Sequence, residues 1–380
     1  GHALMHMFAA FYFVIVLTIE KEWNISYDQL IRLWTLGALL IGLGAIPFGW
    51  LSDRWSRSGT MTIMFIGMGL ASILCGFSTS ISFLFISLSL LGLFCSIYHP
   101  VGIPWVINSA NKQGRALGIN GIFGGVGIGS GAFVAGTLSD LLNWQLAFIL
   151  PGLISIFIGF VLIYLIIIDK ISFKNFFINK NKEDHSRNEM ILIACIMLLS
   201  MFALGLSFHN TQTALPKVFE IRINNINSIQ IGLMIGVVYF ISGATTFFGG
   251  LLADRFNLKL IYLIGIFMQF PCYLAIAYIS GYSLVILCIL AAIFNASILP
   301  TENLLLSNYT PQKYHGIVYG IKFILAFGSG PISVFLISEI YSVTLEFTYL
   351  FLINAFMMAF VSVFILFLPI HNNQKNAIQD

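Results

Sequence analysis

The sequence predicts an all-α polytopic membrane protein, with twelve transmembrane helices in two pseudo-symmetric bundles of six. Three observations predict this fold class: the composition, the recurrence of long apolar runs, and a repeat between the two halves of the chain. Of the 380 residues, 58% are hydrophobic and 9% are charged, whereas soluble domains carry roughly 25% charged residues. A chain with so few charges cannot cover a soluble surface, so its expected surrounding is a lipid bilayer.

The apolar runs divide the chain into two bundles. A helix needs about 20 mostly apolar residues to cross a bilayer. Runs of this kind predict an N-terminal bundle (1–168), a polar linker (169–188), a C-terminal bundle (189–371) and a polar tail (372–380). The spans are expected at 1–19, 30–51, 60–78, 82–107, 115–138, 144–168, 189–213, 229–252, 260–280, 283–306, 314–338 and 347–369.

The placement of Lys and Arg predicts the orientation of these spans. If the first span runs from inside to outside, 13 of these residues lie on the cytoplasmic side, 4 lie outside and Lys322 falls within a span. Cytoplasmic loops carry an excess of Lys and Arg. We therefore expect both termini in the cytoplasm, in a protein integral to a bacterial inner membrane.

The two halves repeat each other at a spacing near 200 residues. Gly49-Trp-Leu-Ser-Asp-Arg54 is followed 201 residues later by Gly250-Leu-Leu-Ala-Asp-Arg255. Pro100 and Pro300 are 200 residues apart, and the segments that begin at Gly114 and Gly316 are 202 apart. Three matches in register indicate two homologous bundles. Transporters that work by alternating access are built in this way, with a site between two rocking halves near the bilayer midplane.

These motifs resemble those of the major facilitator superfamily. Gly49-x-Leu-Ser-Asp53-Arg54-x-x-Arg57 is similar to its loop signature between helices two and three, and Gly250–Arg255, with Asp254, to the second copy. The glycines Gly118, Gly127, Gly131 and Gly136 resemble its antiporter motif, with Ala132 in place of the motif's Pro. Tyr98-His-Pro-x-Gly102 resembles the fosmidomycin-resistance-like branch. The resemblance covers the whole chain and implies the twelve-helix facilitator fold.

Each motif has a structural and a functional interpretation. The resemblance implies that Asp53, Arg54 and Arg57 latch the halves together on the cytoplasmic side in one state; the alternative is a positively charged anchor loop. Glycines at three- to four-residue spacing allow close helix packing, and the resemblance implies a bend or seal that controls leak. Gly330-Pro331 gives a second bend in span eleven.

Ionisable residues inside spans are costly and mark candidate functional positions. They are His2 and His6 in span one, His99 beside Tyr98 in span four, His209 in span seven, Glu302 in span ten and Lys322 in span eleven. In the superfamily fold, spans one, four, seven and ten line the cavity. Histidine can change its charge near neutral pH, so we expect proton coupling through His99 and through His6 or Glu302. The alternative is buried neutral histidines. No third ligand for a metal is visible beside His2 and His6.

Glu302 and Lys322 allow two interpretations. They form a structural ion pair, because a lone buried charge is costly, or Lys322 contacts an anionic group of a solute. The span-four Arg that many facilitator antiporters carry is absent, and Tyr98-His99-Pro100 occupies that region.

The expected function is secondary transport of a small organic solute, anionic or zwitterionic, coupled to protons. Export is favoured by the branch resemblance, and import is the alternative. An enzyme is not expected, since the chain has no HExxH, no GxSxG and no Walker A motif. A channel would not need two rocking halves. We expect no cofactor, no metal, no nucleic-acid partner and a monomeric protein.

Overall fold

The computed structural model describes residues 1–109, 113–171, 187–309 and 315–369, and the described residues are helices and short connections. The first half contains α1 (His2–Ala10), α2 (Tyr12–Trp23), α3 (Tyr27–Ile31), η1 (Arg32–Trp34), α4 (Thr35–Arg54), α5 (Arg57–Gly76), α6 (Ile81–Cys95), α7 (Tyr98–Ser109), α8 (Gln113–Leu141) and α9 (Trp144–Ile167). The second half contains α10 (Arg187–Arg222), α11 (Ser228–Arg255), α12 (Leu258–Phe267), α13 (Gln269–Tyr278), α14 (Ser283–Ser297), α15 (Leu299–Tyr309), α16 (His315–Thr344) and α17 (Thr348–Ile365).

Within the described residues, 12 helical segments are long and apolar enough to cross a membrane. Several of these segments join two consecutive helices, such as α6 with α7 and α14 with α15. The predicted fold class is therefore confirmed. One boundary was wrong: span seven was expected to end at 213, but α10 continues past Pro216 and is helical as far as Arg222. Most of the predicted linker and all of the tail lie outside the described residues.

Interruptions in three segments precede prolines. Residues 96–97 separate α6 from α7 just before Pro100, Ile298 separates α14 from α15 just before Pro300, and Met268 separates α12 from α13 before Pro271. Proline has no amide hydrogen and displaces the carbonyl four residues earlier, which interrupts a helix. Spans four and ten are thus broken at the same place in both halves, as the repeat predicts.

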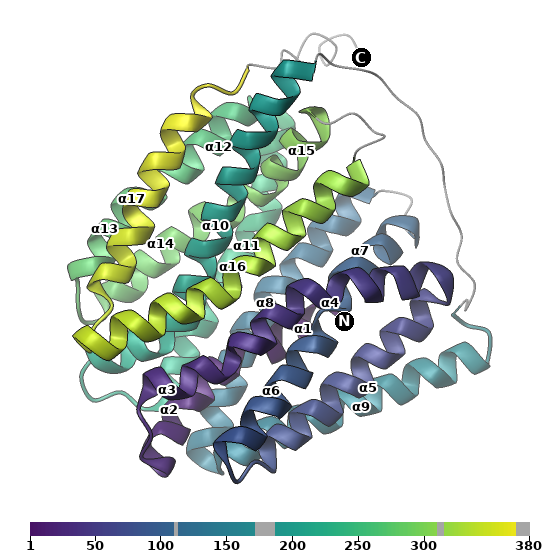
Figure 1. Ribbon diagram of the computed structural model, residues 1–380, viewed down its shortest axis with the longest axis vertical. Coiled ribbons are helices and arrows are strands. Elements are labelled where there is room, and N and C mark those ends of the chain that lie inside the picture. The colour runs from purple at the N-terminus through teal and green to yellow at the C-terminus, as the bar shows by residue number, and fades with distance from the viewer. Residues whose placement is uncertain (110–112, 172–186, 310–314, 370–380) are drawn as a thin grey trace.

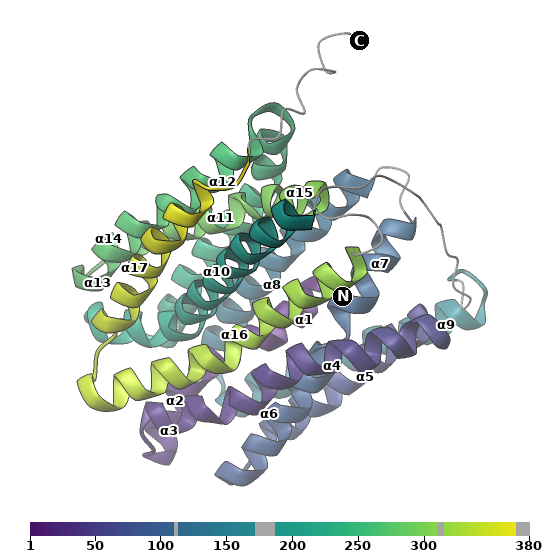
Figure 2. The ribbon, with the colours of Figure 1, turned by 45° about the horizontal axis from the view of Figure 1, so that its top comes forward.

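The halves lie beside each other and contact along two seams (Figure 1). Helix α4 packs against α16, and α8 packs against α11, so each seam joins one helix from each half. The tilted view shows α4 and α16 side by side (Figure 2).

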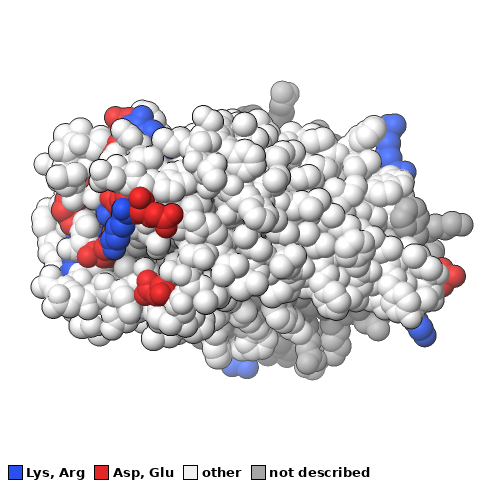
Figure 3. Space-filling model, turned by 90° about the horizontal axis from the view of Figure 1, so that it is seen from below, with Lys and Arg blue, Asp and Glu red and all other residues white. Residues whose placement is uncertain are grey.

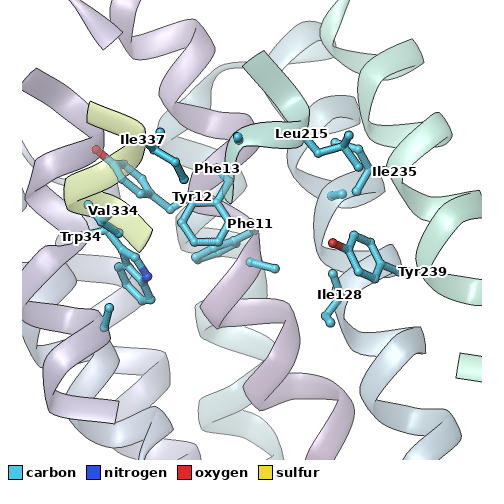
Figure 4. Packing of buried hydrophobic residues seen from close by; sticks show 14 of the residues in the cluster. Phe11, Tyr12, Phe13, Trp34, Ile128, Leu215, Ile235, Tyr239, Val334 and Ile337 are labelled. Carbon is cyan, nitrogen blue, oxygen red and sulfur yellow. The ribbon is translucent and has the colours of Figure 1, made fainter. Parts of the chain in front are cut away.

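A single cluster of buried apolar side chains extends through both halves. Phe11, which joins α1 to α2, and Tyr12 and Phe13 of α2 lie between α16, which contributes Ile337, and the region of α10 and α11 around Tyr239 (Figure 4). The Tyr12 hydroxyl donates to the Leu30 carbonyl oxygen at 2.6 Å, so this buried polar group is satisfied.

Charged side chains gather at the two ends of the molecule, with an uncharged expanse between them (Figure 3). We call the end formed by Arg54, Arg57 and Arg255 the motif end. The opposite end, where Glu20, Lys217 and Arg32 lie, is called the ion-pair end. The uncharged expanse has the composition that a bilayer requires.

Candidate functional site

Three of the predicted histidines lie together between α1 and α7. The His2 and His6 ring centroids are 4.7 Å apart, as expected for residues one helical turn apart. His99 joins them, with its ring centroid 5.5 Å from that of each. One ring nitrogen from each of the three lies within 4.8 Å of the others. The third partner that was not visible beside His2 and His6 in the sequence is therefore His99, which we group with them as the histidine cluster.

Tyr98 and Asn120 fix the orientation of His2. The His2 Nδ1 atom lies 2.5 Å from the Asn120 backbone oxygen; since a carbonyl only accepts, Nδ1 carries the proton. The Tyr98 ring stacks on His2 with centroids 4.7 Å apart, and its hydroxyl donates to Asn120 Oδ1 at 2.5 Å. Asn120 was not predicted as part of this site, because it is an uncharged residue of α8 and belongs to no motif.

Glycines of α8 allow α1, which carries His2 and His6, to lie close to α8. A Cβ added at Gly124 would lie 3.0 Å from the His2 ring, and one at Gly127 would overlap the Ala3 backbone. Gly131 faces the backbone of Met7 in the same way. Gly127 and Gly131, two of the glycines that resemble the antiporter motif, thus allow α8 to pack closely against α1.

The other half approaches the histidine cluster through Phe327 of α16. The Phe327 ring centroid lies 4.8 Å from that of His99. His209 is not among the three clustered histidines; it is half-buried beside Gly330 of α16, which precedes Pro331. The bend expected at Gly330-Pro331 remains a prediction.

Glu302 and Lys322 form an ion pair inside the second half. Lys322 Nζ lies 2.6 Å from Glu302 Oε1 and 2.6 Å from Asn303 Oδ1. The Tyr262 hydroxyl donates to Glu302 Oε2 at 3.1 Å, and Ser200 Oγ lies 2.8 Å from the same hydroxyl. Glu302 is 3% exposed and Lys322 is 9% exposed. The geometry therefore matches the ion-pair interpretation of these two residues.

Glu302 and His99 occupy matching places in the two halves. His99 directly precedes Pro100 in α7, and Glu302 follows Pro300 by two residues in α15. Both lie in the first turns of the helix that resumes after a break. Broken helices frequently form solute and ion sites in transporters with internal repeats. The repeat therefore places one ionisable group at each of the two equivalent breaks.

The loop motifs lie at the motif end. Arg57 is nearly buried, and its Nη2 lies 3.9 Å from Asp53 Oδ1 of the same half. The Arg54 guanidinium lies 4.8 Å from the centre of the Trp50 ring. Gly49 faces Pro100 of α7, whereas a Cβ at Gly250 would meet nothing within 4 Å. Asp254 and Arg255 are exposed. The latch remains a prediction.

Glycines also bring α8 close to α11 across the halves. A Cβ at Gly125 would lie 2.5 Å from the Gly243 Cα, and one at Gly136 would overlap the Ser228 carbonyl. Gly118 is less closely packed, since a Cβ added there would lie 3.9 Å from its nearest neighbour, a ring atom of Phe247. Small residues at such spacing let two helix backbones approach closely.

Charged contacts join the halves at the ion-pair end. Lys217 Nζ of α10 lies 2.6 Å from Glu20 Oε2 of α2, and Lys21 Nζ lies 2.6 Å from Glu220 Oε1. Lys217 Nζ is also 5.5 Å and 5.7 Å from the ring centres of Tyr27 and Tyr341.

Two more contacts join the halves at the ion-pair end. Arg32 of η1 donates to Ser338 Oγ at 2.5 Å and to Glu339 Oε1 at 2.7 Å. The Ile229 amide donates to Asp140 Oδ2 at 3.0 Å. This network was not predicted, because the charges on the outer side were used only to orient the spans.

Glu346, between α16 and α17, is held by Arg222. The two side chains form a bidentate pair, and the Phe347 and Thr348 amides donate to Glu346 Oε2 at 2.6 and 3.1 Å. Burial opposes ionisation of Glu346, but hydrogen bonds from Arg222 and from the Phe347 amide outweigh it and lower the pKa of Glu346 below its usual value. The pair ties α10 to the start of α17.

Comparison with known proteins gives short matches to curated relatives. The riboflavin transporter RibZ of Clostridioides difficile is 29% identical over 147 residues, which cover 37% of this chain and 32% of that protein. The puromycin resistance protein pur8 of Streptomyces alboniger is 26% identical over 119 residues, 30% of this chain and 24% of that protein. The niacin transporter NiaP of Acinetobacter baylyi is 25% identical over 146 residues, 38% of this chain and 33% of that protein. Each alignment thus spans a third or less of the relative's length.

Similarity to solved structures extends over nearly the whole chain. A bacterial homologue of the human lysosomal transporter Spinster, in an inward-facing and occupied conformation, aligns with a TM-score of 0.71 at 15% identity. The alignment covers 96% of this chain and 92% of that one. The inward-facing and unoccupied form aligns with a TM-score of 0.69 at 14% identity, over 97% and 92% of the two chains.

The sequence profile of the Major Facilitator Superfamily matches residues 1–206 and 190–379. The two matches together cover almost the whole chain, and they divide it where the helices divide into two halves. The chain therefore belongs to the Major Facilitator Superfamily of membrane transporters.

Proposed function

We propose that this protein is a proton-coupled secondary transporter of a small organic solute that carries an anionic or zwitterionic group. The observation that carries the proposal is the Glu302–Lys322 pair at the break between α14 and α15. The two charges are buried in the second half of a two-half transporter fold. The relatives named for riboflavin, niacin and puromycin supply the first solutes to try.

The pair links a proton to a solute anion through charge balance. A buried ammonium needs a counter-ion, because a lone charge at membrane depth costs at least about 2.5–3.5 kcal/mol. Among described residues, the titratable groups facing the Glu302 carboxylate are Lys322 of α16 and Tyr262 of α12. When Glu302 takes up a proton, Lys322 loses its counter-ion and a solute anion can replace it.

Two directions of transport have support from different features. Two resemblances support export: the glycine pattern of α8 resembles the antiporter motif, and Tyr98-His99-Pro100-x-Gly102 resembles the fosmidomycin-resistance-like branch. Import is the second candidate, and the Glu302–Lys322 pair favours it. Joint binding of a proton and an anion would move both in the same direction.

The membrane setting belongs to the same proposal. We place the motif end in the cytoplasm and the ion-pair end outside, with both termini cytoplasmic, in a monomer of a bacterial inner membrane. The excess of Lys and Arg at the motif side supports this orientation. With the halves joined at the ion-pair end, the solute path would open toward the cytoplasm.

Transport by purified protein in proteoliposomes tests the proposal. Labelled niacin, riboflavin and puromycin are assayed for counterflow and for accumulation driven by an imposed pH gradient. We expect counterflow of niacin, whose carboxylate is the anionic group that Lys322 would bind, and accumulation that a protonophore abolishes. Riboflavin and puromycin carry no carboxylate and serve as comparison solutes. The direction of the gradient that drives uptake then separates proton antiport from proton symport.

Glu302→Gln should retain counterflow and lose accumulation driven by pH. Glu22→Gln, at an exposed carboxylate near the end of α2, is the matched control and should keep both. Accumulation that follows a sodium gradient and ignores pH would contradict the coupling. Solute flux without counterflow would contradict a carrier.

A further inference from the structure

We propose that His2, His6 and His99 form a binding site for one first-row transition-metal ion of the Zn²⁺ class. Imidazole nitrogen suits Zn²⁺, Cu²⁺ and Ni²⁺, and three histidines with an open fourth position are a known arrangement for Zn²⁺. The site is separate from the Glu302–Lys322 pair, so the inference does not depend on the proposed solute or direction. It reverses the expectation from sequence that no metal site exists.

The ring positions match those of a three-histidine metal centre. With Zn–N bonds of about 2.0–2.1 Å and tetrahedral angles, the imidazole ring centres lie roughly 5 Å apart. The observed separations are 4.7, 5.5 and 5.5 Å. The coordinating nitrogens lie within 4.8 Å of one another, whereas a tetrahedral ion needs roughly 3.3 Å. A movement of roughly 1 Å by each ring, through side-chain rotation, closes the difference.

His2 carries the hydrogen bonding that metal-ligating histidines show. Such a histidine usually donates its second ring N–H to a carboxylate or a backbone carbonyl, which fixes the tautomer. His2 Nδ1 donates to the Asn120 carbonyl at 2.5 Å. Its other nitrogen, Nε2, is buried and has no hydrogen-bond partner among the described residues. The lone pair of Nε2 is thus left for a ligand.

Neighbouring residues hold the His2 ring in this position. Tyr98 stacks on His2 and donates to Asn120, so the ring and its acceptor are held together. Gly124 leaves room beside the His2 ring that a Cβ would fill. The group contains three neutral ligands, so a bound divalent ion would favour water, hydroxide or a carboxylate oxygen in its fourth position.

Binding of Zn²⁺ alone to the purified full chain, prepared without a polyhistidine tag, tests the proposal. Calorimetry should show one ion per chain. His6→Ala and His99→Ala should each weaken the affinity at least about tenfold, as even second-shell changes do at such sites. The matched control is His209→Ala, which removes a half-buried histidine outside the cluster and should leave the affinity unchanged.

X-ray absorption on the wild-type protein gives a second readout that needs no variant. We expect three imidazole nitrogens at about 2.0–2.1 Å from the bound Zn²⁺. Binding that survives His99→Ala, equal loss of binding in His209→Ala, or a spectrum without imidazole scattering would each overturn the proposal.

Discussion

Lys322 is paired with Glu302 in this structure, and substitutions at the two positions test whether the pair stabilises the fold. Both partners of the Glu302–Lys322 pair are buried, and removing one partner of a buried pair typically costs about 3–5 kcal/mol. We expect Lys322→Met to lower the free energy of unfolding by roughly that amount, measured by thermal or denaturant unfolding in detergent. Adding Glu302→Gln should recover much of the loss. A single variant as stable as wild type would exclude a structural pair.

Glu346 should make stability depend on acid pH. Its pKa is lowered in the folded protein, so its contribution is fully present above the usual carboxyl pKa. The contribution is lost as pH falls through the lowered value. Glu346→Gln should therefore destabilise the protein at neutral pH by roughly 1–2 kcal/mol, less than a fully buried pair because the side chain is partly exposed.

The measurement is the melting temperature of wild type and Glu346→Gln between neutral pH and the acid limit of the detergent solution. The two curves should converge on the acid side. A difference that stays constant with pH would show that the ionised carboxylate is not what stabilises α17.

At the residue scale, the sequence predicted some neighbours and not others. The proximity of His2 and His6 follows from helical spacing alone. The approach of His99 does not, because it depends on the break before Pro100 and on how closely α8 packs on α1. The contacts of Lys217 were missed for a similar reason, since its partners include Glu20, far away in the sequence.

At the scale of elements, glycines of α8 set how closely this helix packs on its neighbours. A Cβ at Gly127 would lie within 2.9 Å of Ala3 backbone atoms of α1. Overpacking typically costs about 1–3 kcal/mol, which exceeds the gain of up to about 1 kcal/mol in helix propensity from Gly to Ala. We therefore expect Gly127→Ala to destabilise the protein.

Gly118→Ala is the matched control on the same helix. Its Cβ would have its nearest contact at 3.9 Å, so the propensity gain should leave stability unchanged or slightly higher. Thermal unfolding of both variants checks the pair. Equal effects at both positions would mean that α8 does not pack closely on α1.

Span boundaries were predicted well where apolar runs end at charged loops. Span ten was expected at 283–306 and is found at Ser283–Leu306. The prediction was wrong at the end of α10, because Lys217 and Arg222 are charges inside a helix, and carboxylates far away in the sequence neutralise them. Hydropathy cannot reveal such partners, since they become neighbours only in the folded protein.

At the scale of the whole molecule, the expected orientation can be tested by labelling. Ser186, in the linker and outside the described residues, should react as Ser186→Cys only from the cytoplasmic side. The background should lack Cys195, which is exposed. Labelling by an impermeant reagent added outside intact cells would contradict the orientation.

The central claim is that the halves alternate, with the ion-pair end closed in this structure. Spin labels at Glu22 and Asn224 report on the ion-pair end, and labels at Trp55 and Phe256 report on the motif end; all four positions are exposed. The most direct test compares both distances, by pulsed electron resonance, in wild type and in the variant Lys217→Met with Arg32→Met. Loss of the cross-half ion pairs should lengthen the first distance and shorten the second in the same population. A variant in which the ion-pair end opens while the motif end stays unchanged would contradict alternation.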